Sequence, residues 1–351
     1  MPRSASAPAP PPVPLAVWRD LLAAAHEFRA ARPWDFLSDR DVFALIDERQ
    51  QPWFPSVLGA ARQVFGVVLY RGADGLRFLF EATAIAEAAP DDALFAQDAL
   101  MLDWGAKKAL LPPDLAMLAA LGHAPRPRER LAWPCLRSHR PGWYPWFLEE
   151  GEARELTAGL RATLAAAELA RGHPGFFAPS EKEHDLLPTV TMREALAGPL
   201  RPAQVEWRHW QPSPVPAPVT VLPTPALAAL AALPRAGGGG MEFDVFHAFA
   251  PVAEGARPYF PRLALMADAR SGFIYATEMA PPERSWPELV TAVWIKAVRQ
   301  AGARPEFIDV RRGEWLESLR PLAAALGINL RLVGGLPAIA EARASLKQFN
   351  G

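Results

Sequence analysis

Three carboxylates in the last third of the chain have the residue types and the order that metal-dependent chemistry requires. Asp244 lies in MEFDVFHAF and Asp309 in PEFIDV, two apolar runs typical of buried strands, and Glu341 lies in the helical pattern PAIAEARASL. Carboxylate oxygens bind Mg²⁺ and Mn²⁺, and two such ions about 3.5–4 Å apart stabilise both the attacking and the leaving oxygen of a phosphoryl transfer. Asp244, Asp309 and Glu341 are therefore candidate catalytic residues, with Asp244 and Asp309 as candidate metal ligands and Mg or Mn as the cofactor.

A competing interpretation needs no cofactor. Acids at the ends of strands commonly pair with arginine or cap a helix, and Arg311 and Arg312 follow Asp309 closely in the sequence. The two arginines are candidate binding residues whether or not they pair with the acid. The sequence leaves both interpretations of Asp309 open.

A second candidate binding surface is aromatic. Trp143, Tyr144 and Trp146 in RPGWYPWF could stack on a ligand or a base, whereas packing at the start of the long alanine-rich helix is the alternative. The loop EKEHD, residues 181–185, holds metal-capable side chains. Neighbouring residues of one loop rarely converge on one ion, so we expect a solvated charged loop there.

The elements that must position the acids follow a readable order from Met241 onward. Three strand-like runs, MEFDVFHAF, RPYFPRLALMAD and FIYATEMA, precede a helix that opens with the capping box Ser285 to Glu288 and ends at Gly302. EFIDV then predicts a buried strand, followed by a helix ending at Gly327, the strand INLRLV and a terminal helix. We therefore expect an α/β domain of order β-β-β-α-β-α-β-α.

The preceding residues predict an α+β domain with an antiparallel sheet. Apolar residues recur at helical spacing from Leu15 to Ala31, and DVFALID, PWFPSVLGA and QVFGVVLYRG read as an antiparallel meander. The run Gly237 to Gly240 has no side chains to pack and reads as a flexible link. We expect a disordered Pro/Ala tail at 1–14, an α+β domain of unknown function at 15–235, a glycine linker at 236–240 and the second domain at 241–351.

The order and several strings of the second domain resemble the ribonuclease H-like core of retroviral-type integrases and DDE transposases. DARSGFI resembles the hairpin of that core, and GARPEFIDVRRGEWLESLRPLAAALGI resembles the segment of its second acid. The resemblance implies that Asp244, Asp309 and Glu341 are the first, second and third acids, with the strands of the two aspartates side by side. The chain departs from the family where Val-Arg-Arg follows Asp309 in place of the usual Asn-Gly.

The chain as a whole also resembles a bacterial two-domain family of uncharacterised function. The strings that carry this resemblance are PWDFLSDRDVF, SVLG, VVLYRG and PGWYPW in the first domain, with RPYFP, ARP and LPAIAEA in the second. The resemblance implies kinship and brings no activity with it.

Composition narrows the function classes. The formal net charge is −1, and 241–351 carries 13 Lys and Arg against 12 Asp and Glu, or 13 − 12 = +1, so nucleic acid is a possible partner that the charge does not favour. The single cysteine, Cys135, excludes an internal disulfide and favours a buried thiol. No apolar run approaches the roughly 20 residues of a membrane helix, and the first residues lack a secretory pattern, so we expect a cytoplasmic protein without a membrane partner.

Three functions remain open from the sequence. The first is a non-catalytic protein with a degenerate ribonuclease H-like domain, which acts by binding a protein or a small ligand. The second is a metal-dependent nuclease or strand-transfer enzyme that uses Asp244, Asp309 and Glu341. The third is nucleic-acid binding without cleavage, through exposed arginine and tryptophan side chains.

Overall fold

The structure, a computed structural model, describes residues 8–88, 95–126, 129–178, 185–211, 220 and 224–349. The chain divides into two compact units. The N-terminal unit comprises Pro8–Pro141 and Pro145–Ser213, and the C-terminal unit comprises Pro214–Gly351 together with Gly142–Tyr144. Within the described residues, no helix has the length and apolar character needed to span a membrane. Most of the loop EKEHD lies outside the described residues.

The sheet of the N-terminal unit is mixed, and not antiparallel throughout as the sequence led us to expect. Its order is β5-β4-β3-β2-β1-β6-β7. The strands are β1 (Ala44–Ile46), β2 (Pro52–Leu58), β3 (Gly66–Arg71), β4 (Ala99–Gly105), β5 (Trp133–His139), β6 (Leu186–Thr191) and β7 (Glu206–His209). The first five form the antiparallel meander, but β6 pairs parallel with β1. The parallel pair is possible because a long helical connection between β5 and β6 carries the chain back across the sheet.

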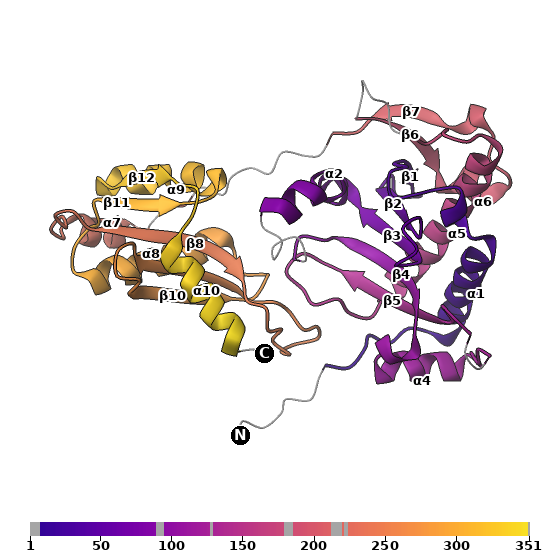
Figure 1. The fold of residues 1–351 in the computed structure, drawn as a ribbon, viewed down its shortest axis with the longest axis horizontal. Coiled ribbons are helices and arrows are strands. Elements are labelled where there is room, and N and C mark those ends of the chain that lie inside the picture. The colour runs from indigo at the N-terminus through magenta and orange to yellow at the C-terminus, as the bar shows by residue number, and fades with distance from the viewer. Residues whose placement is uncertain are drawn as a thin grey trace. The chain divides into compact units, whose positions relative to one another are not determined.

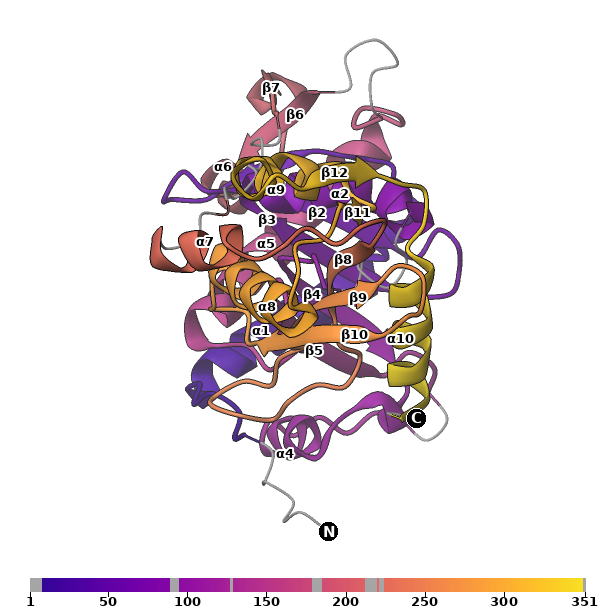
Figure 2. The ribbon, with the colours of Figure 1, turned by 90° about the vertical axis from the view of Figure 1, so that its left-hand side faces the viewer.

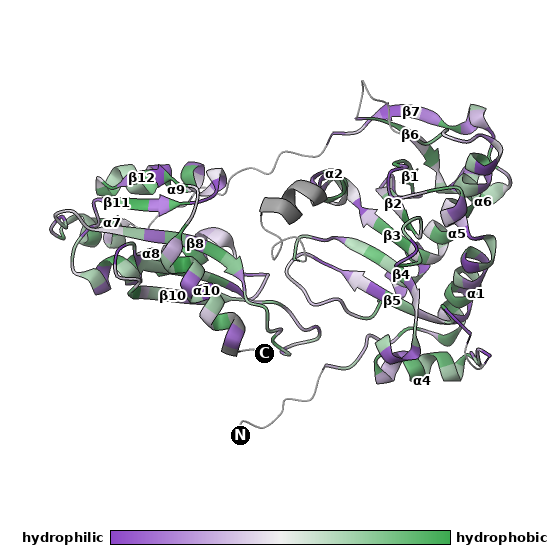
Figure 3. Ribbon diagram, in the orientation of Figure 1, coloured by the Kyte–Doolittle hydropathy of each residue, from purple (hydrophilic) through white to green (hydrophobic). Residues whose placement is uncertain are grey.

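Two cores lie on the two faces of this sheet. Helices α1 (Leu15–Ala31) and α5 (Glu150–Gly172) pack on one face over Leu69, Leu100 and Leu136, and α2 (Gly72–Ala88) lies on the other, where Leu76 and Phe78 meet Phe54 (Figure 1). Hydrophobic and hydrophilic residues both occur along α1 (Figure 3), because one face is buried and the other is in solvent. Shorter elements complete the unit: η1 (Pro33–Asp35), η2 (Lys107–Ala109), α4 (Pro112–Ala120), α6 (Met192–Ala197) and η3 (Pro202–Gln204).

The C-terminal unit contains the second sheet, of order β10-β9-β8-β11-β12 (Figure 2). Its strands are β8 (Gly240–His247), β9 (Arg262–Asp268), β10 (Ile274–Ala280), β11 (Phe307–Val310) and β12 (Asn329–Leu332). The pairs β10·β9 and β9·β8 are antiparallel, whereas β8·β11 and β11·β12 are parallel, so this sheet is also mixed. From β8 to the last helix, the elements of the unit follow the order β-β-β-α-β-α-β-α that the sequence predicts, and one further helix precedes β8.

Helices cover the two faces of the second sheet unequally. Helices α7 (Thr224–Ala231), α8 (Trp286–Ala301) and α9 (Gly313–Leu326) pack on one face around Phe243, Val245 and Trp294. On the other face, α10 (Pro337–Phe349) alone covers Phe246, Leu265 and Ala267. Residues 242, 244 and 246 of β8 therefore point toward the face of α10, since side chains alternate along a strand.

The Gly237–Gly240 run, which we expected to link two domains, lies inside the C-terminal unit. Gly240 is the first residue of β8 and pairs with Phe307 of β11. A side chain at Gly240 would have its Cβ 2.0 Å from the ring atom Cε2 of Phe307, so this glycine allows the two strands to approach each other.

Candidate functional site

Three carboxylates lie on the face of the second sheet that α10 covers. Asp244 and Glu242 are two residues apart on β8, and Asp309 on β11 stands directly opposite Glu242 in the parallel register. The strands of the two predicted aspartates are neighbours, as the sequence implied. All three residues are buried: Glu242 is 3% exposed, Asp244 is 1% exposed and Asp309 is 9% exposed. Charges in such a position must be compensated.

Asp309 is compensated by an arginine of the next strand. Arg331 on β12 is paired with Asp309 in the parallel register, and its Nε and Nη2 donate to Oδ1 and Oδ2 at 2.6 and 2.7 Å. The same guanidinium group stacks on the Phe307 ring, 3.3 Å from the ring centroid. Both oxygens of Asp309 are therefore engaged by one planar cation, in the two-pronged geometry that guanidinium and carboxylate prefer.

Asp244 lies between two other arginines. Nε of Arg312 is 3.5 Å from its Oδ1, and Nη1 of Arg343 on α10 is 3.9 Å from its Oδ2. The backbone N–H of Val245 also donates to Oδ1, at 2.9 Å. Burial raises the pKa of the Asp244 carboxyl, and the charges of Arg312, Arg311 and Arg343 act in the opposite direction.

Glu242 is compensated by a helix end. The backbone N–H of Ile339, in the first turn of α10, donates to Glu242 Oε2 at 3.0 Å. The first N–H groups of a helix have no partner within the helix and carry partial positive charge, so a carboxylate is favoured there. Burial raises the pKa of Glu242, and the hydrogen bonds from Ile339 and Ala338 oppose that rise.

Glu341, the third acid of the predicted triad, is exposed on α10. Within the described residues, no three His, Cys, Asp or Glu side chains gather as metal ligands would. The arrangement places two of the predicted acids on one sheet face and surrounds them with arginine and a helix N-terminus. What these groups do chemically is neutralise charge.

Arg311 and Arg312, the predicted binding residues, follow β11, and the charges of both act on Asp244. Arg312 Nη2 donates to the backbone oxygen of Val245 at 2.9 Å, and its Nη1 is 3.7 Å from Glu314 Oε1. The charge of Arg311 acts on the pKa of Asp244. The competing interpretation placed an arginine beside Asp309, and that arginine is Arg331 from another strand.

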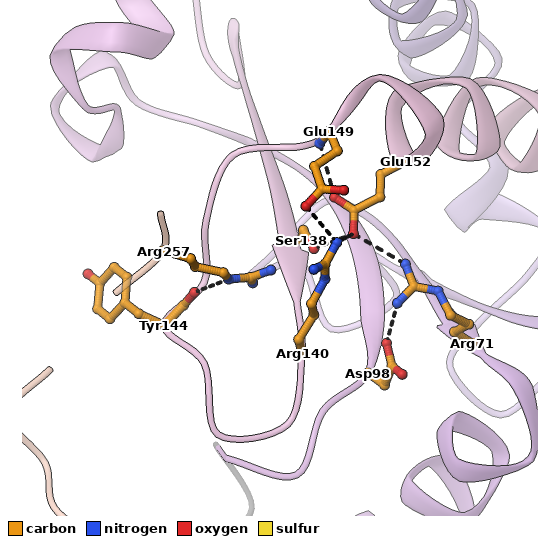
Figure 4. A network of polar contacts seen from close by, with 8 residues as sticks. All are labelled: Arg71, Asp98, Ser138, Arg140, Tyr144, Glu149, Glu152 and Arg257. Atoms are coloured by element: carbon orange, nitrogen blue, oxygen red, sulfur yellow. Dashed lines mark hydrogen bonds and ion pairs between the residues drawn. The ribbon is translucent and has the colours of Figure 1, made fainter. Parts of the chain in front are cut away.

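The predicted aromatic surface is divided between the two units. Gly142–Tyr144 forms part of the C-terminal unit: Trp143 bridges Tyr259, and their rings are 6.0 Å apart. The backbone oxygen of Tyr144 accepts from Nε of Arg257 at 3.1 Å (Figure 4). Trp146 belongs to the N-terminal unit, where it is 6% exposed and bridges Ser138 of β5. Trp146 is therefore packed inside the N-terminal unit.

Comparison with known proteins identifies two families. Residues 18–187 match the model of a family described as a domain of unknown function (DUF7309), and residues 226–347 match that of a second domain of unknown function (DUF6930). Neither description assigns an activity, and the two matches are consistent with a two-domain protein. No curated protein and no solved structure matched the chain.

A buried polar network in the N-terminal unit was not predicted from the sequence. Figure 4 shows Ser138, Arg140 and Arg71 converging on Glu152, in the first turn of α5. Ser138 Oγ and Arg140 Nη2 donate to Glu152 Oε1 at 2.8 and 2.9 Å, and Arg71 Nη2 at 3.4 Å. Arg71 also pairs with Asp98 at 2.5 Å. Residues of β3, of α5 and of the end of β5 thus meet at the Glu152 carboxylate, and Arg71 links them to Asp98 at the start of β4.

Some of the residues that sequence reasoning missed could have been identified from the sequence pattern, and others could not. Glu242 carried a signal, because it stands two residues before Asp244 on a predicted strand and must share its face. Arg331 and Arg343 carried none, since each reaches its carboxylate from an element distant in the sequence. Of the loop EKEHD, only Asp185 is described, and it is near His209 Nδ1 at 3.3 Å. Glu181, Glu183 and His184 lie outside the described residues.

Proposed function

We propose that the C-terminal unit is a ribonuclease H-like domain that has lost metal-dependent catalysis and acts by binding another protein. The fold half of the proposal is supported by the β8·β11 pair, which sets the strands of Asp244 and Asp309 side by side, as the resemblance implies. It is also supported by the element order from β8 to α10. The loss of catalysis is argued from the charges around the acids.

The observation that carries the proposal is the bidentate ion pair between Arg331 and Asp309. A carboxylate that binds Mg²⁺ must offer an oxygen to the ion. Both oxygens of Asp309 are taken by a guanidinium group, and Asp244 is flanked by two more. Arginine thus supplies, permanently and within the chain, the positive charge that a metal ion supplies in a working two-metal site.

Binding of a protein partner is supported by the edge of the sheet. β10 is the last strand on its side, and Ile274 and Met279 on it are 43% and 59% exposed, with Phe273 just before it at 55%. Ile274 and Met279 pair with Ala267 and Leu263 of β9, so they lie on the same face of the sheet as α10. The residues that α10 covers on this face are those of β8 and β9. An edge strand with exposed apolar side chains favours the addition of a partner strand.

Calorimetric titration of Mn²⁺ into the full chain and into the Asp309→Asn variant tests the loss of catalysis. We expect no heat of binding in the micromolar range for either protein, and no cleavage of DNA or RNA in the presence of Mg²⁺ or Mn²⁺. Micromolar binding that Asp309→Asn abolishes would overturn the proposal and support the metal-dependent nuclease or strand-transfer enzyme. The Glu341→Gln variant then tests whether the third acid takes part.

The binding surface is tested with a double variant, Ile274→Lys/Met279→Lys, which places charge along β10 without touching the core. The matched control is Leu332→Lys on β12, which is 56% exposed at the opposite edge of the same sheet. We expect proteins that are cross-linked to the wild-type chain in cells to be lost from the double variant and kept by the control. Equal cross-linking of the same proteins by all three would place the partner elsewhere.

A further inference from the structure

A cavity of about 250 Å³ lies wholly within the N-terminal unit. It is bounded by the turn between β1 and β2, by the first half of α5 and by α6. Asp47 shapes the turn, because its Oδ1 accepts from the backbone N–H groups of Arg49 and Gln51, both at 2.8 Å. The cavity is independent of the carboxylate face in the C-terminal unit and plays no part in the function proposed above.

One wall of the cavity is apolar. Trp53, Ala158, Met192 and Leu196 form it, and Trp53 is fixed by a hydrogen bond from its Nε1 to Asp47 Oδ2 at 3.2 Å. Leu196 is 48% exposed, although Met192 one turn earlier on α6 is buried. Small-molecule sites combine such an apolar wall with a few polar groups.

The charged side chains of the cavity divide into partnered and unpartnered groups. Asp47 is used by the turn, and Arg154 pairs with Glu150 at 2.7 Å. The remaining four, Glu48, Glu155, Arg49 and Arg193, have no hydrogen bond or ion pair from their side chains to any residue that the structure describes. Two are acidic and two are basic, so a bound group of a single charge would leave one pair repelled or unused.

Glu155 is the deepest of these four groups. It is half-buried on α5, one turn after Glu152, whereas Glu48, Arg49 and Arg193 are exposed at the rim. Burial raises the pKa of its carboxyl, and the negative charges of Glu152 and Asp47 add to that rise. The positive charges of Arg71 and Arg49 act against it. A half-buried carboxylate that accepts no side-chain hydrogen bond is costly to keep charged, and a cation that enters the cavity and contacts it directly would relieve that cost.

We propose that this cavity binds a small zwitterion with an apolar side chain, the chemistry of an aliphatic amino acid or a dipeptide. The ammonium group lies at Glu155, the carboxylate group lies at the rim with Arg49 and Arg193, and the side chain packs on Met192 and Leu196. A simple anion would meet Glu155, and a simple amine would leave both arginines unused. A zwitterion with an apolar side chain uses Glu155, both arginines and the apolar wall together.

Calorimetry with four probes tests the proposal on the full chain. Leucine carries both charges, isoamylamine lacks the carboxylate, 4-methylpentanoate lacks the ammonium group, and leucyl-leucine is the dipeptide. We expect leucine or leucyl-leucine to bind and each one-charge analogue to bind at least about tenfold more weakly. The tighter of the first two identifies the source of the zwitterion. Absence of binding by both at about 10 mM, or equal binding by a one-charge analogue, overturns the proposal.

Two variants separate binding from folding. Glu155→Gln removes the charge that holds the ammonium group, and we expect a loss of at least about tenfold in affinity with an unchanged unfolding transition. The matched control is Glu168→Gln on the same helix, at an exposed pair with Arg171 away from the cavity, which leaves affinity unchanged. Affinity of the wild-type chain also falls as acid protonates Glu155, and this pH dependence is absent from Glu155→Gln. Wild-type affinity in Glu155→Gln contradicts the assignment.

Discussion

Asp309 and Arg331 occupy paired positions on two parallel strands. Nε of Arg331 donates to Oδ1 of Asp309, and Nη2 donates to Oδ2. The pair is asymmetric, because the side chain of Asp309 is 12% exposed whereas that of Arg331 is 43% exposed. Removing the arginine would therefore leave a buried charge uncompensated, whereas an arginine left alone stays in water.

The Arg331→Gln variant measures this asymmetry. We expect it to lower the free energy of unfolding by about 1–3 kcal/mol, because Asp309 loses its charged partner. Urea unfolding at pH 7 checks the value. The control is Arg320→Gln, whose pair with Glu317 is exposed on both sides and whose loss changes stability by less than about 0.5 kcal/mol. Equal effects of the two variants would mean that Asp309 does not depend on Arg331.

The network around Glu152 predicts a pH effect. Burial alone would raise the pKa of Glu152, but the hydrogen bonds from the Glu149 N–H, Ser138 and Arg140 outweigh it and lower the pKa below the ordinary 4.5. A carboxyl with a lowered folded-state pKa stabilises the fold above its unfolded pKa, and this contribution is lost as pH falls through the folded pKa. Glu152→Gln should therefore cost about 1–3 kcal/mol at pH 7 and progressively less below pH 4.5. Urea unfolding across this range tests it, and a pH-independent difference would contradict it.

His247 predicts an effect in a different pH window. Burial, with the nearby charges of Arg262 and Arg312, lowers the pKa of this imidazole from 6.5 to about 4. Between these values the unfolded chain binds a proton that the folded chain does not, so stability falls as pH decreases from 6.5 toward 4. The loss reaches up to about 3 kcal/mol, and His247→Gln removes that part of the pH dependence. Thermal unfolding of both proteins at pH 7 and pH 5 measures it.

Gly240 predicts an effect of packing. In Gly240→Ala the new Cβ meets the Phe307 ring, on which the Arg331 guanidinium also stacks, so we expect a loss of about 1–3 kcal/mol. Gly237→Ala is the control, because no atom lies within 4 Å of its Cβ position, and its effect should stay within about 0.5 kcal/mol. Equal stability of the two variants in urea would show that the ring can move.

The order of elements in the C-terminal unit was predictable because residues next to each helix end determine where the helix begins and ends. Ser285 accepts from the Glu288 N–H at the start of α8, and the helices α8 and α9 end at Gly302 and Gly327, both in the left-handed conformation. Each of these signals acts over four residues or fewer.

The compensation of the acids was not predictable because it depends on register between distant strands. Arg331 follows Asp309 by 22 residues, and only the parallel alignment of β11 and β12 sets the two side by side. A shift of one residue would turn Arg331 to the opposite face of the sheet. The parallel pairing of β6 with β1 was missed for the same reason, because nothing in the sequence of β6 indicates which strand is its neighbour.

Gly142–Tyr144 belongs to the C-terminal unit although it lies far before that unit in the sequence. These three residues pair with 258–260 and lie inside the stretch that matches the first family, 18–187. A gene fragment that encodes only the second family, 226–347, would omit them and leave Tyr259 and Phe260 without the rings they pack against. The segment that matches the first family model therefore supplies three residues to the packing of the C-terminal unit.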